Sequence, residues 1–460
     1  MRIYSDTFEA LVNKAINLTN DFRGEFLDVR LEQRHVLDLV HAGRNVESYG
    51  PAFDEGGFVR VLSGGNWGTA SFTGLEQLSS SLERAIARAE DITGGPRIQL
   101  AAGSGLVKTV GRPSVEPLCD VPMKEKAFLC RRYCDLMAAA LPDVSSRVYY
   151  REIERERVIL SSLGTRVREH ESICGMSLEM TGGEHATSVS RAFSHRGGFE
   201  FVRHRERLIE EMAEELSGRD TDRSITPGEY RVLVDPELAG ILTHEAFGHL
   251  SEADFQRDSP ALEDLLELGR QVGPPSVNVV DDATMQDMPG SYDFDDEGEP
   301  GQSTTLVSGG KLVGRLHSLQ TAGAEGSRST GNGRAVDFRK PPEVRMSCTY
   351  LEPGDLDLES MLALMDEGLY LRGATGGTTD MERFSFTSEA AYIVKGGMVR
   401  DPVRPVTISG SVFDVLGSVR ALGDELSMFS GIGGCSRGED HYLPVSFGGP
   451  HVLLGSVYAG

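Results

Sequence analysis

The first half of the chain alternates between two spacings of apolar residues. Apolar positions recur at helical spacing over 6–20, 74–90 and 122–140, and charged residues occupy the intervening positions. Three strand-like segments, in which apolar and polar residues alternate, lie between the first two helices: EFLDVRLEQ, VLDLVHAG and FVRVLSGG. We therefore expect helices and strands to be mixed in this half.

Two further segments complete the first half. Residues 146–178 have the pattern of successive antiparallel strands with polar outer faces, and a helix is predicted over roughly 200–216. The polar segment 217–230 then has the composition of an interdomain connection. Because 460 residues exceed the size of one ordinary core, we expect two domains, spanning 1–222 and 223–460.

The second half is rich in glycine and in strand-like patterns. It opens with the short strand RVLVD and one helix, and runs such as TTLVSGGKLVGRLHS and AAYIVKGGMVR then resemble hairpins with Gly-Gly turns. The chain contains 54 glycines, which favours turn-rich β-structure over long helical bundles. The pattern therefore predicts a second half that is made mainly of strands.

Composition and charge exclude several functions. The formal net charge of −24 repels phosphate backbones, so we expect no nucleic-acid partner. No apolar stretch approaches the roughly 20 residues that span a bilayer, and the N-terminus lacks the apolar core of a signal peptide. Six cysteines are too few for a disulfide scaffold in a chain of this length. We therefore expect no membrane partner and a cytoplasmic protein with reduced thiols.

The segment DPELAGILTHEAFGHLSEAD, from Asp235 to Asp254, carries the most informative pattern. Asp235 is a good N-cap, and a proline follows it at the first helical position. The helix then presents His244 and Glu245, and a second histidine, His249, lies five positions after the first. Zinc binds neutral imidazole, and a glutamate beside such a ligand can act as a base. The segment is therefore a candidate metal site.

The spacing of the two histidines conflicts with a regular helix. At about 100° per residue their imidazoles diverge by about 140°, so they converge only if the helix widens, as at a π-bulge, or ends between them. Gly248 lowers the cost of such a distortion. We therefore predict an irregular helix around Ala246–Gly248. The alternative is a pair of ordinary helix histidines, one half-buried and one solvated.

A catalytic zinc site needs a third protein ligand and one position for water. The candidates are Glu252, Asp254, a distant histidine and a distant cysteine. Cys435 lies in the Gly-rich loop SGIGGCSRGEDHYLPVSFGGP, where it is poorly placed for core packing, and a thiolate would bind zinc strongly. The alternative for Cys435 is an ordinary buried thiol.

Five segments of the second half occur in an order and spacing that match one known family. They are HEAFGHLSEAD, DDEGEPGQSTTLVSGGKLVG, RSTGNGRAVDFRKPPEVRMSCTYLEPGD, RFSFTSEAAYIVKGGMVRDPVRPVTISG and GIGGCSRGEDHYLPVSFGGPHVLL. In these segments the chain resembles the TldD/PmbA family of metallopeptidases, and the first half fits less sharply, chiefly in SYGPAFDEGGFVRVLSGGNWGTASF. Two departures, at Gln302-Ser303-Thr304 and Arg339–Pro342, leave the substrate preference open.

The resemblance implies a fold and a set of ligands. It implies an α+β fold, in which a mixed α/β N-terminal domain is followed by a β-rich, antiparallel and barrel-like C-terminal domain, with the metal at their interface. It implies Zn2+ held by His244, His249 and Cys435, with Glu245 as the general base. Because the chain keeps the metal motif, it resembles the TldD-like catalytic subunit.

The same resemblance implies partners and an activity. We expect a zinc-dependent peptidase that cleaves small or unfolded peptides with water activated by zinc and Glu245. We also expect a dimer, either a homodimer or a heterodimer with a related subunit that lacks the metal motif. The alternative is a non-catalytic peptide-binding or regulatory subunit with a structural zinc, which a fourth protein ligand near His249 would favour.

One acidic segment resembles a calcium-binding loop. It reads Asp293-x-Asp295-x-Glu297-Gly298, but the position that should carry a bidentate glutamate is Thr304. We therefore predict a solvated turn here, with no bound calcium.

Overall fold

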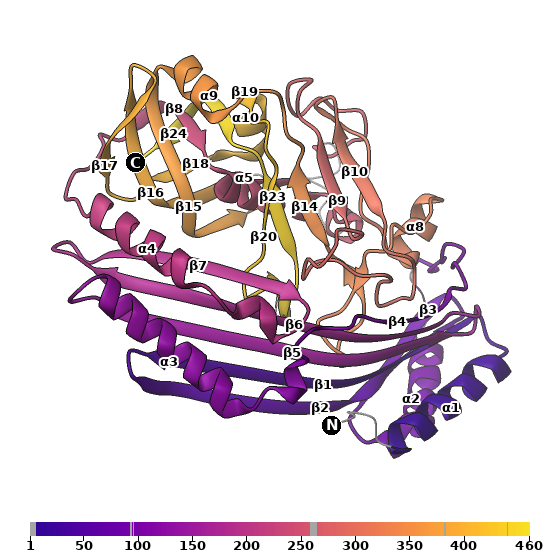
Figure 1. Cartoon of the computed structure of the whole chain (residues 1–460). Helices are drawn as coiled ribbons and strands as arrows, with labels where there is room; N and C mark the ends of the chain where they lie inside the picture. The colour runs from indigo at the N-terminus through magenta and orange to yellow at the C-terminus, as the bar shows by residue number, and fades with distance from the viewer. Residues whose placement is uncertain (1–5, 93, 95, 258–264, 381–382, 439) are drawn as a thin grey trace.

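The computed structural model in Figure 1 describes residues 6–92, 94, 96–257, 265–380, 383–438 and 440–460. The α-helices are α1 (Asp6–Asp21), α2 (Leu78–Asp91), α3 (Met123–Ala140), α4 (Glu206–Arg219), α5 (Pro236–Thr243), α6 (Ala253–Arg257), α8 (Leu319–Glu325), α9 (Leu358–Met365) and α10 (Val412–Gly417). The helices predicted over 6–20, 74–90 and 122–140 are confirmed as α1, α2 and α3. Among the described residues, no helix is long and apolar enough to cross a membrane.

The N-terminal region is built around one seven-stranded sheet. Its strands, in sheet order, are β3 (Asn66–Phe72), β2 (Asn45–Ser63), β1 (Phe26–Ala42), β5 (Ser145–Ser161), β6 (Arg166–Gly182) and β4 (Val107–Gly111), and β7 (Thr187–Arg196) pairs with another part of β6. A single strand, β1, covers both EFLDVRLEQ and VLDLVHAG, and it pairs antiparallel with β2 and β5. The antiparallel strands predicted within 146–178 are β5 and β6.

The two faces of this sheet differ in character because side chains alternate along each strand. On β1, Leu27, Val29 and Leu31 belong to a core that includes residues of α1 and α2, and a second core on the same face packs against α3 and α4. Figure 1 shows the two helix pairs near opposite ends of the sheet. The other face carries buried charged residues, among them Asp28 and Arg30. This charged face is turned toward the C-terminal region.

One helix boundary differs from the prediction. The helix expected over roughly 200–216 is a 3₁₀ turn at Phe199–Val202 followed by α4. The two are separated at His204, whose φ of +58° is incompatible with a continuous right-handed helix. The polar connection is shorter than expected, because α4 extends to Arg219 and the next strand begins at Gly228.

Five strands of the C-terminal region close into a barrel. They are β15 (Glu367–Asp380), β8 (Gly228–Val234), β24 (Val452–Ala459), β18 (Thr407–Ser411) and β16 (Arg383–Lys395), and β16 pairs back with β15. The pairing of β8 with β15 is parallel and the other barrel pairings are antiparallel. Two strands extend the barrel sheet: β17 (Met398–Val403) and β19 (Val419–Leu422). The expected α+β fold with a barrel-like second half is confirmed.

A six-stranded sheet packs beside the barrel. In sheet order it contains β11 (Lys311–Leu312), β10 (Ser303–Ser308), β9 (Val279–Asp282), β14 (Cys348–Leu351), β23 (Ser446–Gly449) and β20 (Ser427–Phe429). Two short pairs lie outside it: β12 (Gly333–Arg334) with β13 (Glu343–Val344), and β21 (Cys435–Arg437) with β22 (Asp440–Leu443). Helix α5 lies between the barrel and this sheet and contacts β14, β15, β20 and β23 (Figure 1).

The two hairpins with Gly-Gly turns are also confirmed. Gly309 and Gly310 connect β10 to β11, and Gly396 and Gly397 connect β16 to β17. All four glycines have positive φ, between +57° and +75°. Two consecutive residues of positive φ suit a type I′ turn, whose twist matches that of paired strands.

The prediction of a solvated turn for the acidic segment, Asp293–Glu299, is wrong. Asp295, Asp296 and Glu297 are only 1%, 5% and 2% exposed. Asp296 accepts a hydrogen bond from Arg157 of β5 at 2.9 Å, and Glu297 accepts one from Arg60 of β2 at 2.9 Å. The segment is therefore inserted against the charged face of the N-terminal sheet, where arginines replace water as partners.

Candidate metal centre

Helix α5 begins as its sequence predicts. The Asp235 carboxylate accepts a hydrogen bond from the Leu238 amide at 2.9 Å, and Pro236 is the first helical residue. Leu238 is fully buried in the core that the barrel shares with the six-stranded sheet. The N-cap and this buried side chain together set the direction of the helix toward the candidate ligands.

The predicted irregularity of the helix is confirmed. Residues His244–Gly248 form a π-helical turn, and the His249 amide donates to the carbonyl of His244. A bond that spans five residues widens the helix, so the two histidines can converge despite their spacing. Gly248 is required at this turn, because a Cβ there would lie 1.8 Å from the Sδ atom of Met346.

Three potential ligand atoms come together at the end of this turn. One atom each of His244, His249 and Cys435 lies within 4.8 Å of the others. Cys435 Sγ is 3.2 Å from His249 Nε2, and the two imidazole rings are 5.4 Å apart between centroids. In the part of the chain that the structure describes, the Nδ1 atom of the buried His244 has no hydrogen-bond partner. These residues are separated by almost two hundred positions in the sequence but share one site.

Cys435 reaches the site on a segment that the N-terminal sheet holds in place. The thiol begins β21 and is 6% exposed, so it is buried, although its loop is rich in glycine. Ser194 of β7 donates to the carbonyl of Gly431 at 2.7 Å, and Arg151 of β5 donates to the carbonyl of Ile432 at 3.3 Å. The candidate centre therefore depends on contacts between the two halves of the chain.

The electrostatics of the site favour a thiolate. Burial raises the pKa of the Cys435 thiol, but the adjacent His244 and His249 lower it overall to about 4. Burial lowers the pKa of His249, but Glu252 and Cys435 together raise it well above 6.5. An imidazolium therefore faces a thiolate, and a divalent cation between them would displace the shared proton.

Glu252 and Asp254, the other candidate ligands of the motif, lie outside this group. Glu252 is fully buried behind His249, with a carboxylate oxygen 3.3 Å from Nδ1, the ring atom that does not face Cys435. The Nη1 atom of Arg437 lies 3.2 Å from Oε2 of Glu252 and 2.9 Å from Oδ1 of Asp254. A carboxylate that binds the far nitrogen of a metal-binding histidine fixes the ring and its tautomer.

Glu245, the candidate base, is half-buried at the π-helical turn. Within the described ranges of the chain, its carboxylate forms no hydrogen bond or ion pair with the protein. The group is therefore available to a substrate or to water beside the three candidate ligands.

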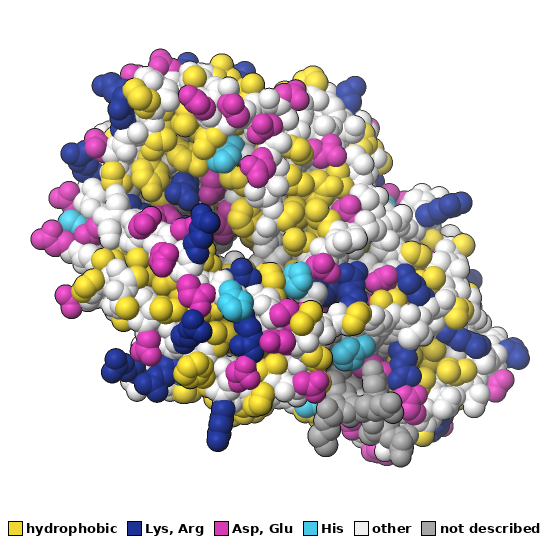
Figure 2. Space-filling view, viewed as in Figure 1, with side chains coloured by type: hydrophobic (Ala, Val, Ile, Leu, Met, Phe, Trp, Pro, Cys, Tyr) yellow, Lys and Arg dark blue, Asp and Glu magenta, His cyan; other side chains and the backbone are white. Residues whose placement is uncertain are grey.

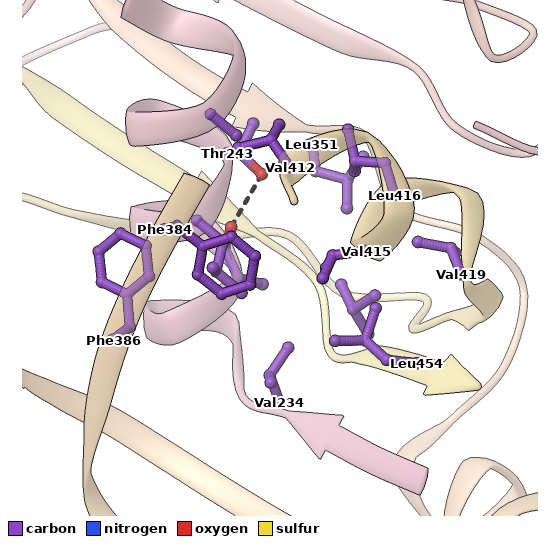
Figure 3. A pocket seen from close by; sticks show the side chains of 14 residues that line it. Val234, Thr243, Leu351, Phe384, Phe386, Val412, Val415, Leu416, Val419 and Leu454 are labelled. Carbon is purple, nitrogen blue, oxygen red and sulfur yellow. Dashed lines mark hydrogen bonds between the residues drawn. The ribbon is translucent and has the colours of Figure 1, made fainter. Parts of the chain in front are cut away.

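The opposite side of the helix is apolar. Figure 3 shows a cavity of about 30 Å³ lined by α5, strands β8, β16 and β24, and α10, with Val234, Phe384 and Leu454 among its residues. Thr243, which also faces it, donates its hydroxyl hydrogen bond to the carbonyl of Ala239 at 2.8 Å. The cavity is small and apart from Thr243 is lined by apolar side chains, so it offers no group of polar side chains that could bind a metal ion or catalyse a reaction.

The donor atoms suit a zinc ion. Two imidazoles and one thiolate are borderline-soft ligands, and three protein ligands leave a position for water in a tetrahedral site. The described residues do not engage the Nδ1 atom of His244, and one nitrogen of this ring lies within the group of three ligand atoms. The residues present therefore fit a catalytic zinc site.

Sequence reasoning considered Glu252 only as a ligand and did not identify Arg437 or Arg151. Glu252 lies three positions after His249, so helical spacing could have indicated a carboxylate beside that imidazole. Arg437, two residues beyond Cys435, and Arg151, on the N-terminal sheet, have no local pattern that points to the site.

Comparison with known proteins identifies related sequences over most of the chain. Three domains of the PmbA/TldA metallopeptidase match this chain. Residues 27–93 match domain 1, residues 116–220 match the central domain and residues 227–459 match the C-terminal domain. A metalloprotease of Synechocystis sp. is 33% identical over 450 residues, which cover 95% of each chain. A metalloprotease of Methanothermobacter thermautotrophicus is 33% identical over 462 residues, which cover 95% of this chain and 96% of the relative.

Solved structures share the fold. A crystal structure of a Thermotoga maritima protein has a TM-score of 0.80 at 22% identity and covers 98% of this chain and 100% of its own. TldE from Thermococcus kodakarensis has a TM-score of 0.73 at 15% identity and covers 99% of this chain and 100% of its own. At such low identity these structures support the architecture alone.

Proposed function

The chain belongs to the PmbA/TldD family of metallopeptidases, and we propose that it is a zinc-dependent peptidase that cleaves small or unfolded peptides. The observation that supports this proposal most directly is the convergence of His244, His249 and Cys435, whose ligand atoms lie within 4.8 Å of one another. In the proposal these three residues hold the zinc ion, and the fourth position stays open for water or substrate.

The protein residues supply orientation and proton transfer. When bound, zinc would supply Lewis acidity, which polarises a carbonyl group and lowers the pKa of water. Glu245 takes a proton from the attacking water at its free carboxylate and returns it to the leaving amine. Glu252 holds the His249 ring through Nδ1, which keeps Nε2 aimed at the metal position.

The proposed substrate is an extended peptide. Strand β20 lies at the edge of the six-stranded sheet, and among the described strands it pairs only with β23. Phe429 of β20 stacks on Phe447 of β23, and Phe447 lies 6.3 Å from the ring of His244. A peptide that adds to this edge through its backbone would pass close to the metal site without a requirement for particular side chains.

The alternative is a non-catalytic peptide-binding or regulatory subunit with a structural zinc. A structural site is closed by four protein ligands. Among the described residues, the candidate group has three members, and Glu252 is turned toward the other side of His249. This arrangement favours the catalytic proposal. The expected dimer, whether a homodimer or a heterodimer, also remains a prediction, and size-exclusion chromatography with light scattering would test it.

The proposal is tested by Glu245→Ala. We expect this variant to bind one zinc per chain, because Glu245 is not a proposed ligand, and to lose peptide cleavage by a factor of about 100 or more. Elemental analysis and hydrolysis of a mixture of unstructured peptides, with and without chelator, would measure the two properties. Full activity of the variant would contradict the role of Glu245, and chelator-resistant cleavage would contradict the role of zinc.

A further inference from the structure

A pocket of about 370 Å³ lies at the junction of the N-terminal sheet and the barrel. Its walls come from β7, α4, the first turn of α5, β15, β16 and β20. In Figure 2 the surface is hollowed between the part that carries α4 and β7 and the part that carries β15 and β16, and basic and acidic side chains gather at its rim. The volume is in the range of ligand pockets, so it admits a long side chain or a peptide end.

Most of the charged groups in this pocket already have partners. Arg191 forms ion pairs with Glu215 and with Glu389, the second at 3.1 Å. Glu389 also accepts a hydrogen bond from the Ser190 amide at 2.8 Å. Asp235 accepts a hydrogen bond from the Leu238 amide as the N-cap and another from the Gly373 amide of β15. These carboxylates are therefore satisfied within the protein.

The other two arginines are also engaged. The Arg205 guanidinium lies 4.7 Å from the ring centroids of both Phe193 and Phe201. Arg372 faces Glu215, with 3.9 Å between the nitrogen and the carboxylate oxygen. The Phe193 and Phe201 rings are therefore already engaged by the guanidinium group of Arg205.

Glu237 is different. Among the residues that the structure describes, its carboxylate forms no hydrogen bond and no ion pair. One of its oxygens lies 3.6 Å from the position that a Cβ of Gly373 would occupy, and both residues line the pocket. Burial, with the negative charges of Asp235 and Glu389, raises the pKa of Glu237 to about 7. The raised pKa means that the ionised carboxylate is disfavoured at this position, and a cation bound in the pocket would stabilise it.

Glu237 and His244 lie on the same face of one helix. They are seven positions apart (244 − 237 = 7), which corresponds to nearly two full turns and to about 10.5 Å along the axis. An extended chain advances about 3.3 Å per residue, so this distance equals about three residues of a bound peptide. Phe429, which lines the pocket, stacks on Phe447, and Phe447 in turn lies near His244. The pocket and the candidate metal centre therefore lie along one continuous surface.

We propose that Glu237 in this pocket binds a cationic group of the substrate about three residues from the scissile bond. This inference rests on the proposed peptidase function and gives it a substrate preference. The group is an alkylammonium or a guanidinium, supplied either by a lysine or arginine side chain or by the α-amino group of a peptide end. A carboxylate recognises both sources in the same way.

The proposal has a definite pH dependence. The acidic groups that face Glu237 are Asp235, the N-cap of its own helix, Glu389 on β16 and Glu215 on α4. The basic groups are Arg191 on β7, Arg372 on β15 and Arg205, which directly precedes α4. The cation binds the ionised form of Glu237, whose pKa of about 7 leaves much of it protonated at pH 6. The affinity for a lysine peptide, which stays charged over this range, therefore rises between pH 6 and pH 8, and the affinity for a neutral peptide does not rise. A free α-amino group loses its own charge near pH 8, so its affinity should pass through a maximum below that pH.

The test uses zinc-loaded Glu245→Ala protein, which binds peptides without cleaving them. The probes are acetylated octapeptides of Ala, Ser and Gly with a fluorescent C-terminus, which carry one lysine or one norleucine at successive positions. A third set has a free amino terminus and no lysine. Fluorescence anisotropy gives Kd for each peptide, and the lysine and free-amine sets distinguish the two sources of the cation.

We expect the best cationic peptide to bind about fivefold more tightly than its neutral counterpart at pH 8, since a charge-assisted contact that stays partly solvated is weakened by screening. Glu237→Gln abolishes the difference and its pH dependence. Glu359→Gln retains both, because Glu359 occupies the first turn of α9, another eight-residue helix, and is exposed. Since the ionised Glu237 is half-buried without a partner among the described residues, its replacement by the neutral glutamine should not lower the melting temperature at pH 8.

Two outcomes overturn the inference, and they are distinguishable from each other. Equal binding of lysine and norleucine peptides, or a preference that survives Glu237→Gln, overturns the inference alone if wild-type protein still cleaves the peptides. If zinc-loaded wild-type protein cleaves none of them, the peptidase function fails and the inference fails with it.

Discussion

The candidate metal centre and the acidic segment, Asp293–Glu299, both bury charge at the junction between the two halves of the chain, but they differ in how their polar atoms are satisfied. In the acidic segment, Asp295 accepts hydrogen bonds from the amides of Glu297, Glu299 and Gly333. Asp296 accepts from Arg157 and from the amide of Ala335. At the metal centre, by contrast, the described structure leaves the Nδ1 atom of His244 without a partner.

Whether its polar atoms have partners within the protein helps to distinguish a charged group that stabilises the fold from one that binds a ligand. A buried charge whose oxygens are all paired is part of the fold, since any further ligand would have to displace a protein group. A polar group without a partner points to a ligand only where it also lies in a pocket or beside other ligand atoms, because buried atoms such as Arg30 Nη1 lack hydrogen-bond partners among the described residues without any such site. Glu237 follows the second pattern, and this is why we assign it a ligand. Three further changes test the comparison.

The largest effect is expected for Asp296→Asn. The change leaves the buried Arg157 and Arg30 without their shared counter-charge, so we expect the free energy of unfolding to fall by about 3–5 kcal/mol. Chemical denaturation would measure it. Asp293→Asn is the matched control, because its pair with Lys108 is partly solvated and is worth at most about 1 kcal/mol. Equal losses in both variants would contradict a structural role for the buried pair.

The same pair predicts an acid dependence. Burial raises the pKa of Asp296, but Arg157 and Arg30 outweigh it and hold the pKa far below 3.8. A lowered pKa contributes stability that is present above the unfolded value and is lost as the pH falls through the folded value. The difference in stability between wild type and Asp296→Asn should therefore stay constant above about pH 5 and shrink as the pH falls below about 4.

The next effect is expected for Cys435→Ser. Zinc sites of four ligands bind with about 10–16 kcal/mol, so the loss of one thiolate should cost about 3 kcal/mol, or a factor of about 100 in Kd for zinc. Competition with a chromogenic chelator would measure the affinity. Cys119→Ser, at an exposed thiol away from the site, should bind zinc like wild type. Stoichiometric, unweakened zinc in Cys435→Ser would mean that another residue is the third ligand, with Glu252 as the first candidate.

The smallest of the three effects is expected for Glu252→Gln. The amide removes the negative charge that holds the His249 ring through Nδ1. Zinc affinity should therefore fall by about tenfold, which is the smallest loss typical when a residue that orients a metal-binding histidine is replaced. Asp254→Asn is the control, because Asp254 shares Arg437 with Glu252 but does not touch His249. If the two variants lose the same affinity, the effect comes from Arg437 and the contact with His249 has no separate role.

Local signals allowed several elements to be predicted from the sequence. The period of apolar residues located α1, α2 and α3, and the Gly-Gly pairs located two hairpin turns. The spacing of His244 and His249 required a widened helix, and the π-helical turn confirms that prediction. Each of these features depends on residues within a few positions of one another, so the short-range geometry of the backbone is sufficient to predict them.

Long-range contacts could not be predicted in the same way. The acidic segment was expected to be solvated, because nothing near Asp296 in the sequence indicates that Arg157 lies opposite it. The helix expected over 200–216 begins later, because His204 adopts positive φ between a 3₁₀ turn and α4. In both cases the outcome depends on which surfaces meet, and for the acidic segment the arginines opposite it offset much of the cost of burying its carboxylates.

By itself, then, the sequence determined the local features of this protein: the capped helix, the distortion between its two histidines and the strand-rich character of the second half. The family resemblance implied that Cys435 joins His249, but its residues alone left other ligands open, and the tertiary structure places the thiol 3.2 Å from that ring. Only the tertiary structure decided that Glu252 stands behind the ring and that Glu237 faces a pocket without a partner among the described residues. The physical reason is that a residue's local conformation follows from its immediate neighbours, whereas its electrostatic partners are supplied by distant segments that only the packed fold brings within a few ångströms.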